Sequence, residues 1–349
     1  MRPSWKMMLI GCGVLMLSGC PFGHGLTFSV EVIGLDLVEP KGDALNDRDI
    51  VAGAAFPPVG QISPAVWRNG QVVFVEKMFD IGILHGINNL NVVVGVQLRS
   101  VGSRFHFVSF VETTAPPPRM IASGELYSVS EVNEFVGFSD QRAALGFVAN
   151  DNVLLFEGED SMLDATGAYD INDSRDFVGW MYSAAEGRRL AVKWLDGGAR
   201  TLLDSLGGTF SEAYAINSDG VTVGVSTFPP AAKTTEPHHA VFWLDTEIRR
   251  FPELGEAEST AWDINDSGEA VGYLEDENGG LRAVLWGAPG VFGRIAVTDL
   301  NDVVDFGDAA PGSIVLREAI DINEVGTILC RAERTIGNAV ERVYVLLRR

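Results

Sequence analysis

Cysteine and basic residues are both scarce in this chain. Only 3 of the 349 residues are cysteine, too few for the disulfide framework of a small secreted domain. Lysine and arginine total 26 against 47 aspartate and glutamate residues, which gives a formal net charge of −21. We expect no binding to nucleic acid, because such binding depends mainly on Lys and Arg contacts with phosphates.

Long hydrophobic runs are confined to the first twenty residues. Arg2 and Lys6 precede an apolar run from Met7 to Leu17, which is too short for a permanent transmembrane helix. The run ends in Leu17-Ser18-Gly19-Cys20, and no later stretch reaches about 18 apolar residues. This pattern predicts a cleavable signal, with an ordinary secretory signal peptide or a signal anchor as the alternatives.

The Leu-Ser-Gly-Cys sequence resembles the lipobox of bacterial lipoproteins. The resemblance implies that residues 1–19 are a signal peptide that is removed, that Cys20 is acylated, and that residues 20–26 form a short tether. Pro21 stands where Asp commonly signals retention in the inner membrane, so the resemblance implies an outer-membrane destination. The lipid would attach the protein to the membrane, and the periplasmic and surface faces both stay open.

The remainder of the chain repeats one motif seven times, in ten-residue segments that align without gaps. The segments begin at Ala44, Gly86, Ser128, Asp170, Ala215, Asp263 and Asp321. The third position holds Asn46, Asn88, Ser130, Asn172, Asn217, Asn265 and Asn323. The tenth position holds Gly53, Gly95, Gly137, Gly179, Gly224 and Gly272, with Cys330 in the last segment.

Turn chemistry accounts for these positions. Asn or Ser at the third position starts a tight turn, because its short side chain bonds the backbone just ahead. The sixth position holds Gly, Asn or Asp in six segments, which suits a left-handed backbone, and Arg175 is the outlier. The tenth-position glycine predicts a bulge or a close backbone approach in the second strand of each hairpin.

Strand-like segments after each hairpin extend most units to four strands. The pattern predicts an all-β protein, a β-propeller of seven four-stranded blades in a single domain over residues 27–349. The last unit lacks a fourth strand, and the alternating segment from Leu26 to Val38 has no hairpin of its own. We expect this N-terminal segment to supply the missing outer strand and close the ring.

The units also resemble the HAF-type extracellular repeat of bacterial envelope and secreted proteins. The linker from Leu203 to Asn217 and the strand His239-Ala240-Val241-Phe242-Trp243 carry the resemblance. It implies a propeller-like fold and an envelope location, and it implies no defined activity.

Motifs for catalysis and metal binding are sparse. The sequence contains no HExxH, GxSxG, phosphate loop or GxGxxG, so no catalytic residue, cofactor or metal site is predicted. Calcium at acidic turns such as Asp263–Gly268 is an alternative, but other units form the turn without the first Asp. A metal at His238-His239 would need partners from other loops.

These features predict a lipid-anchored binding or scaffolding module of the cell envelope, monomeric and without catalytic activity. Its ligand would be an envelope protein or a glycan. The alternative is a hydrolase or lyase acting on extracellular glycan with carboxylates at the propeller centre, and a purely structural envelope protein is a third possibility. Charged side chains converging at one end of the channel would favour the enzyme. The long Thr227–His239 loop, Trp180 and Trp262 are candidate contact sites, with packing or tolerated insertion as the competing interpretation.

Overall fold

The computed structural model describes the chain from Phe28 onward with several gaps. The described residues are 28–33, 44–57, 60–75, 81–98, 105–111, 119–120, 124–139, 141–148, 153–156, 165–196, 198–229, 236–254, 258–288, 295–306 and 313–349. The predicted signal peptide (1–19) and the tether (20–26), with Cys20, lie outside the described residues. Of the Leu26–Val38 segment, residues 28–33 are described. No helix among these residues has the length and apolar character needed to cross a membrane.

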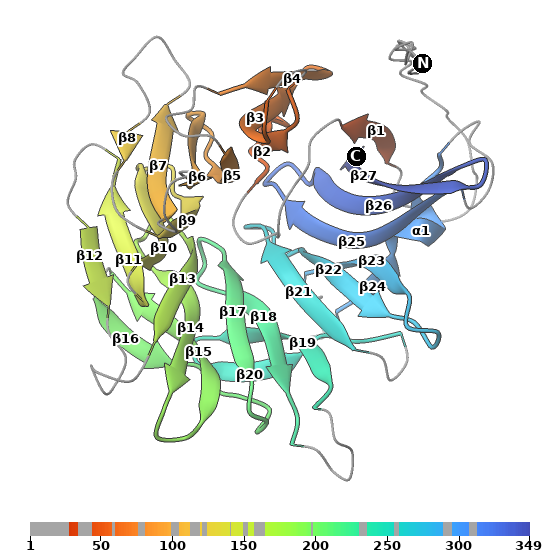
Figure 1. Cartoon of the computed structure of the whole chain (residues 1–349). Coiled ribbons are helices and arrows are strands. Elements are labelled where there is room, and N and C mark those ends of the chain that lie inside the picture. Colours follow the sequence, from red (N-terminus) through yellow and green to blue (C-terminus); the bar gives the residue numbers. More distant parts are fainter. Residues whose placement is uncertain are drawn as a thin grey trace.

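Antiparallel sheets surround a central axis (Figure 1), and we number the units 1 to 7 by their turns. Six sheets of the described chain have four strands. Units 2 to 4 comprise β5 (Ile81–Ile87), β6 (Val92–Leu98), β7 (Phe105–Val111), β8 (Arg119–Met120); β9 (Glu125–Val129), β10 (Glu134–Ser139), β11 (Arg142–Phe147), β12 (Val153–Phe156); and β13 (Thr166–Ile171), β14 (Phe177–Ser183), β15 (Arg188–Leu195), β16 (Ala199–Leu202). Units 5 and 6 comprise β17 (Ser211–Ile216), β18 (Thr222–Thr227), β19 (His238–Leu244), β20 (Glu247–Arg250); and β21 (Ser259–Ile264), β22 (Ala270–Glu275), β23 (Leu281–Trp286), β24 (Val297–Asp299), followed by the short helix α1 (Leu300–Val303).

Unit 7 is closed by the N-terminal strand, as predicted. Its sheet has the order β1 (Ser29–Ile33), β27 (Ala339–Arg348), β26 (Ile328–Ile336) and β25 (Ile314–Ile322), with β25 innermost. Strand β1 runs antiparallel to β27, with Ser29 opposite Arg348 and Ile33 opposite Tyr344. Figure 1 shows the red β1 beside the dark blue β27. The two ends of the chain therefore share one sheet.

The prediction of seven four-stranded blades is wrong in unit 1. Its sheet contains only β2 (Val51–Ala55), β3 (Ser63–Arg68) and β4 (Gln71–Phe74). The innermost position is held by Leu45, which forms an isolated bridge with Val51. The sequence just before it is Pro40-Lys41-Gly42-Asp43, and Pro, Gly and Asp all disfavour strand.

The first hairpin of every unit turns through a left-handed residue at the sixth motif position. The φ angles there are 55° at Asp49, 62° at Asn91, 63° at Asn133, 66° at Arg175, 79° at Gly220 and Gly268, and 81° at Gly326. Arg175 therefore has the same backbone as the other six although its residue type is unusual there. Its guanidinium reaches Glu134 of unit 3, with Nε 2.8 Å from Oε1.

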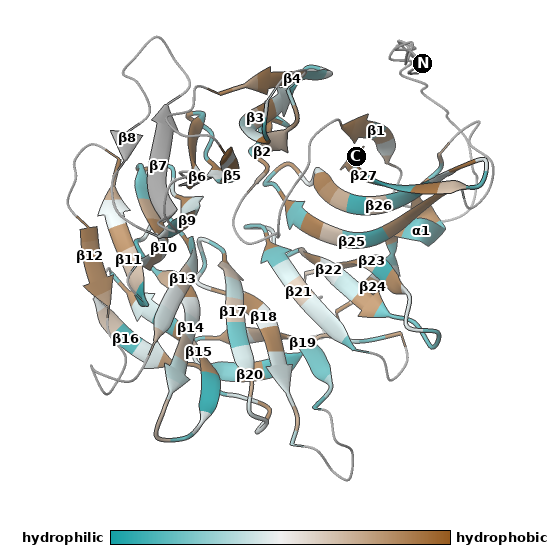
Figure 2. Cartoon of the chain, viewed as in Figure 1, coloured by the Kyte–Doolittle hydropathy of each residue, from teal (hydrophilic) through white to brown (hydrophobic). Residues whose placement is uncertain are grey.

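Apolar side chains fill the spaces within and between neighbouring sheets. The bulkiest are Trp194, Trp243 and Trp286, which occupy the same place in the third strands of units 4, 5 and 6 and are fully buried. Figure 2 shows hydrophobic residues in brown on strands throughout the propeller. Strands such as β2, β13, β17 and β18 are buried along their whole length, because other sheets cover both of their faces. Cys330 is buried in unit 7, and burial raises the pKa of its thiol far above the usual value.

Candidate functional site

The seven turns converge on the axis and enclose a cavity of about 180 Å³. Side chains from the second, third and fourth motif positions of the units line it, together with the first-position residues Asp170, Asp263 and Asp321. The third-position residues form the turns that the sequence predicts within each unit, and the structure also brings them together across units. We call this end of the channel the turn face.

Each third-position Asn bonds its own turn and the next unit. In unit 4, Asn172 Oδ1 accepts the backbone N–H groups of Ser174 (3.1 Å) and Asp176 (3.0 Å), while Nδ2 donates to the carbonyl of Asn217 (3.0 Å). The same cross-unit donation joins Asn46 to Asn88, Asn88 to Ser130, Asn217 to Asn265, Asn265 to Asn323 and Asn323 to Asn46. Because unit 7 donates to unit 1, the hydrogen bonds continue through the closure of the ring.

Ser130 interrupts this ring of amides. Its hydroxyl accepts the N–H of Glu134 at 3.2 Å but is too short to reach unit 4 as the Asn side chains do. The neighbouring contact is instead made by Ser128, whose hydroxyl donates to Asp170 at 2.8 Å. The boundary between units 3 and 4 thus lacks the contact that the other six boundaries share.

We predict that Ser130→Asn stabilises the protein. The new amide would donate to the Asn172 carbonyl, and its Oδ1 would replace the Ser130 hydroxyl as acceptor for Glu134. One added buried hydrogen bond contributes about 1 kcal/mol, or about 1.5 °C in Tm for a chain of this size. Calorimetry of the variant beside Ser130→Ala, which should lose stability, checks this. A Tm at or below that of the unchanged protein would contradict it.

A second ring runs through the fourth motif position. The backbone N–H of one unit donates to the side chain of the next unit at distances between 2.7 and 3.1 Å. The donor and acceptor pairs are Asp47 with Asn89, Asn89 with Glu131, Glu131 with Asp173, Ser218 with Asp266, Asp266 with Glu324, and Glu324 with Asp47. Five carboxylates therefore gather at the turn face, and each of them accepts a backbone N–H from the preceding unit.

Three first-position aspartates lie deeper in the channel. Asp170 accepts Ile216 N–H at 2.8 Å, Asp263 accepts Ile322 N–H at 2.7 Å, and Asp321 accepts Leu45 N–H at 2.9 Å. Asp263 and Asp321 also share a side-chain hydrogen bond. Burial raises the pKa of Asp263 to about 7 and that of Asp321 well above its usual value, so this pair takes up protons at higher pH than exposed carboxyls do.

These pKa shifts predict greater stability at mildly acidic pH. Burial also raises the pKa of Glu324 to about 7, so between about pH 4 and 7 Asp263 and Glu324 bind more protons in the folded state than in the unfolded chain. The stabilisation is complete below about pH 4 and is lost as the pH rises through 7. We expect a larger free energy of unfolding in urea at pH 5 than at pH 7. Glu324→Gln, which keeps an acceptor for Asp266, should reduce this difference, and equal values at both pH values would contradict the prediction.

The repeat glycines lie where two inner strands approach each other closely. A Cβ at Gly179 would stand 2.0 Å from the carbonyl oxygen of Gly167, and one at Gly95 would stand 2.1 Å from that of Ile83. Contacts of 1.9 to 2.1 Å recur at Gly137, Gly224 and Gly272. Gly53 pairs with Ala65 in unit 1. These positions serve the packing of each hairpin and contribute no side chain to the cavity.

The inner strands of units 2 to 6 each contain a β-bulge, and the bulged residue of each carries an aromatic or imidazole ring. The bulged residues are His85, Tyr127, Tyr169, Tyr214 and Trp262. Consecutive ring centroids are 5.4, 5.5, 5.6 and 4.7 Å apart, so the rings form a continuous arc. This arc was not predicted, although the residue immediately before the ten-residue motif is aromatic or His in all five units.

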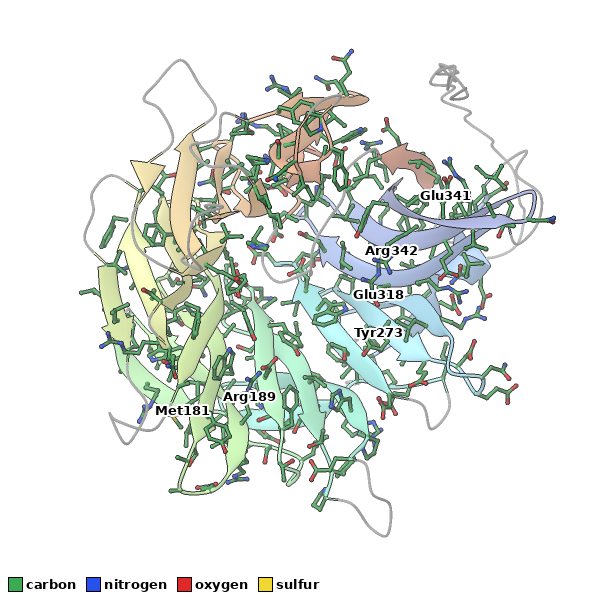
Figure 3. All side chains as sticks on the ribbon, in the orientation of Figure 1. Met181, Arg189, Tyr273, Glu318, Glu341 and Arg342 are labelled. Carbon is green, nitrogen blue, oxygen red and sulfur yellow. The ribbon has the colours of Figure 1, made fainter. Side chains whose placement is uncertain are left out.

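A row of half-buried rings, which we call the ring row, lies toward the strand ends of units 4 and 5 that are opposite the turns. We call this side of the propeller the far face. The Arg189 guanidinium carbon lies 4.1 Å from the Trp180 ring centroid and 5.8 Å from that of Phe210. Phe210 stacks on His238 with centroids 5.2 Å apart. Arg189 also pairs with the buried Glu212, which receives the Tyr169 hydroxyl at 3.5 Å. Figure 3 shows Arg189 among the side chains between β15 and β17.

The Thr227–His239 loop contributes to this row at its described ends. Thr227 donates to Glu236 at 2.7 Å, and Glu236 also accepts Thr209 N–H at 2.7 Å. His239 contacts Glu253, with Nδ1 2.9 Å from Oε1, while its neighbour His238 packs in the row. Across the part of the chain that is described, no three His, Cys, Asp or Glu side chains are grouped to hold a metal ion.

Comparison with known proteins shows the fold and no family. The chain resembles the β-propeller domain of the Trilobed protease from Pyrococcus furiosus, described as having an open velcro topology, with a TM-score of 0.57 over 90% of this chain and 94% of that one. The chain is a β-propeller. At 13% identity the likeness shows the fold alone.

Other comparisons of this propeller are weaker or negative. TolB from Acinetobacter baumannii aligns with a TM-score of 0.42 and 10% identity, over 85% of this chain and 79% of that one. No family model matches the chain, and no curated protein matches it.

Proposed function

We propose that this propeller is a lipid-anchored binding or scaffolding module of the cell envelope, monomeric and attached to the outer membrane through Cys20. The lipobox residues Leu17-Ser18-Gly19-Cys20, with Pro21 after them, support the anchor. The resemblance of the units to HAF-type repeats supports the envelope location. The ligand would be an envelope protein or a glycan.

The ring row of the far face carries the binding proposal. Trp180, Arg189, Phe210 and His238 come from two neighbouring units and are already stacked without a ligand. A Cβ at Gly167 would lie 2.6 Å from Trp180 Nε1, so the indole lies directly over the backbone of its partner strand. Preformed aromatic surfaces lose little conformational entropy on binding and are common in recognition sites.

A matched pair of variants tests this site. Trp180→Ala removes the ring that Arg189 covers, whereas Phe56→Ala removes a ring that is 68% exposed in unit 1, away from the row. We expect Trp180→Ala to weaken binding to peptidoglycan fragments or envelope oligosaccharides at least about tenfold, as for a central aromatic contact. Intrinsic fluorescence titration measures the affinity. Equal loss in both variants, or in neither, would reject the far face as the site.

The alternative function, glycan hydrolysis or elimination, has one observation in its favour. Carboxylates do converge at the turn face, as expected for the enzyme. However, Asp263 and Asp321 are hydrogen-bonded to each other, whereas glycosidase carboxyls stand about 5 Å apart or more to admit a sugar. The carboxylates of the second ring, at the fourth motif position, accept backbone N–H groups from neighbouring turns, and these bonds between units explain why the carboxylates converge.

A further inference from the structure

The tip of each turn is the fifth motif residue, and these tips divide the turn face into two halves. Units 7, 1, 2 and 3 carry Val325, Arg48, Leu90 and Val132, whereas units 4, 5 and 6 carry Ser174, Asp219 and Ser267. Val325, Val132 and Leu90 are 63%, 56% and 52% exposed. Turn tips favour polar residues, so three exposed apolar tips on one half of the ring have no explanation in turn formation.

Strand β1 joins the fold beside units 7 and 1, at one end of this apolar half. The Arg349 guanidinium lies 5.9 Å from the ring centroid of Phe28. Its Nη1 would lie 3.1 Å from a Cβ at Gly326, the neighbour of Val325. Arg348 bonds Glu31 of β1 at 2.7 Å and Asp49, the neighbour of Arg48, at 2.5 Å. Phe28 and β1 are thereby fixed beside the turns of units 7 and 1.

The proposed anchor holds this half of the turn face close to a bilayer. Phe28 is the eighth residue after Cys20, and an extended chain over these eight steps spans at most about 28 Å. Acyl chains supply the membrane affinity, so the apolar tips need only orient an already attached body. Leu and Val side chains at turn tips suit shallow contact with lipid headgroups and the acyl boundary.

Charge selects the kind of lipid surface. The carboxylates of Asp47, Glu131, Asp173, Asp266 and Glu324 gather on the same face. An anionic membrane surface would repel them, because its negative potential extends about a Debye length from the headgroups. Zwitterionic headgroups with an exposed ammonium, such as phosphatidylethanolamine, are compatible with both the carboxylates and the apolar tips.

We propose that Val325, Leu90 and Val132 dock the propeller on a zwitterionic bilayer with the turn face toward the lipid. This inference rests on the proposed anchor at Cys20. The far face, with its ring row, then points away from the membrane to which the protein is attached.

Two single-cysteine variants of the lipidated protein test the orientation. Arg48→Cys and Asp219→Cys place a fluorophore on matched charged tips at opposite sides of the ring, and the native Cys330 is buried and unlabelled. In phosphatidylethanolamine–phosphatidylcholine vesicles containing nitroxide lipids, we expect the probe at 48 to be quenched several-fold more than the probe at 219. Replacing Leu90, Val132 and Val325 together by Ser should remove the difference.

The outcomes separate docking from anchoring. Protein that floats with the vesicles but shows equal quenching at both probes overturns the docking proposal alone. Protein that fails to float, or whose flotation is unchanged by Cys20→Ser, overturns the anchor and with it the proposed function. Quenching at 48 that increases when phosphatidylglycerol is added would overturn the choice of a zwitterionic surface.

Discussion

Gly224→Ala is expected to lower the free energy of unfolding by at least about 3 kcal/mol, the upper range for overpacking. The added methyl would lie 2.1 Å from the Glu212 carbonyl oxygen and 3.0 Å from Ala213 Cα. Both are backbone atoms of the neighbouring inner strand, so relief requires moving that strand and the bulge at Tyr214. Thermal unfolding should show a decrease in Tm of about 4 °C or more.

Gly198→Ala is the matched control for this substitution. A Cβ at Gly198 meets nothing within 4 Å, and the residue lies in the turn between β15 and β16. We expect a change within about 0.5 kcal/mol, as for other surface positions. If the two alanine variants unfold at the same temperature, the repeat glycines are not required by close packing.

Removing β1 is expected to have an effect of similar or greater size. Phe28, directly before the strand, and Ile33 at its end are buried against residues of β27, and Val30 packs against the same cluster as Phe28. Arg348 donates a hydrogen bond to Glu31. Burial of such side chains contributes about 1.5–3 kcal/mol each, so loss of the strand should cost about 4 kcal/mol and about 6 °C in Tm. A variant that lacks residues 1–33 is compared with one that lacks residues 1–27 and keeps the strand intact.

Local probes make this second prediction specific to closure. Hydrogen exchange should rise first in β27 and β26 when β1 is removed, because β27 becomes an unpaired edge. The sheets of units 3 and 4, across the ring, should keep their protection. Uniform loss of protection throughout the chain, or equal stability of the two truncations, would show that β1 does not close the ring.

Periodic features of the sequence allowed much of this fold to be predicted. The Asn and Gly positions recur at fixed places because each turn and each close strand approach has the same local geometry, and closure by β1 followed from the missing strand of the last unit. The three-stranded unit 1 was not predicted, since the reduction of its inner strand to the Leu45 bridge breaks the period. Arg175 adopts the left-handed backbone although its residue type does not predict it. Its ion pair with Glu134 joins units 3 and 4.

The candidate site was less predictable because it exists only between units. The cross-unit bonds of residues such as Asn172 and Asp263 depend on how seven turns meet around the axis, which no single repeat encodes. The aromatic arc required the bulge that redirects Tyr169, a feature set by strand register. Cys330 replaces the repeat glycine in unit 7, where β25 has an additional bulge after Leu316 that the other inner strands lack among their described pairs.

The amide bonds between turns are directional, since each Asn donates to the next unit and, except at Asn172 after Ser130, its carbonyl accepts from the unit before. Such head-to-tail contacts close only if the rotations from one copy to the next add up to a full circle. Ring geometry therefore constrains the total number of units, whereas the outer strands and connections of each unit can diverge. It also means that the position of the chain break is arbitrary for the amide network, which passes from unit 7 to unit 1 as it does elsewhere. Circular permutation would move the break without changing which amide meets which carbonyl.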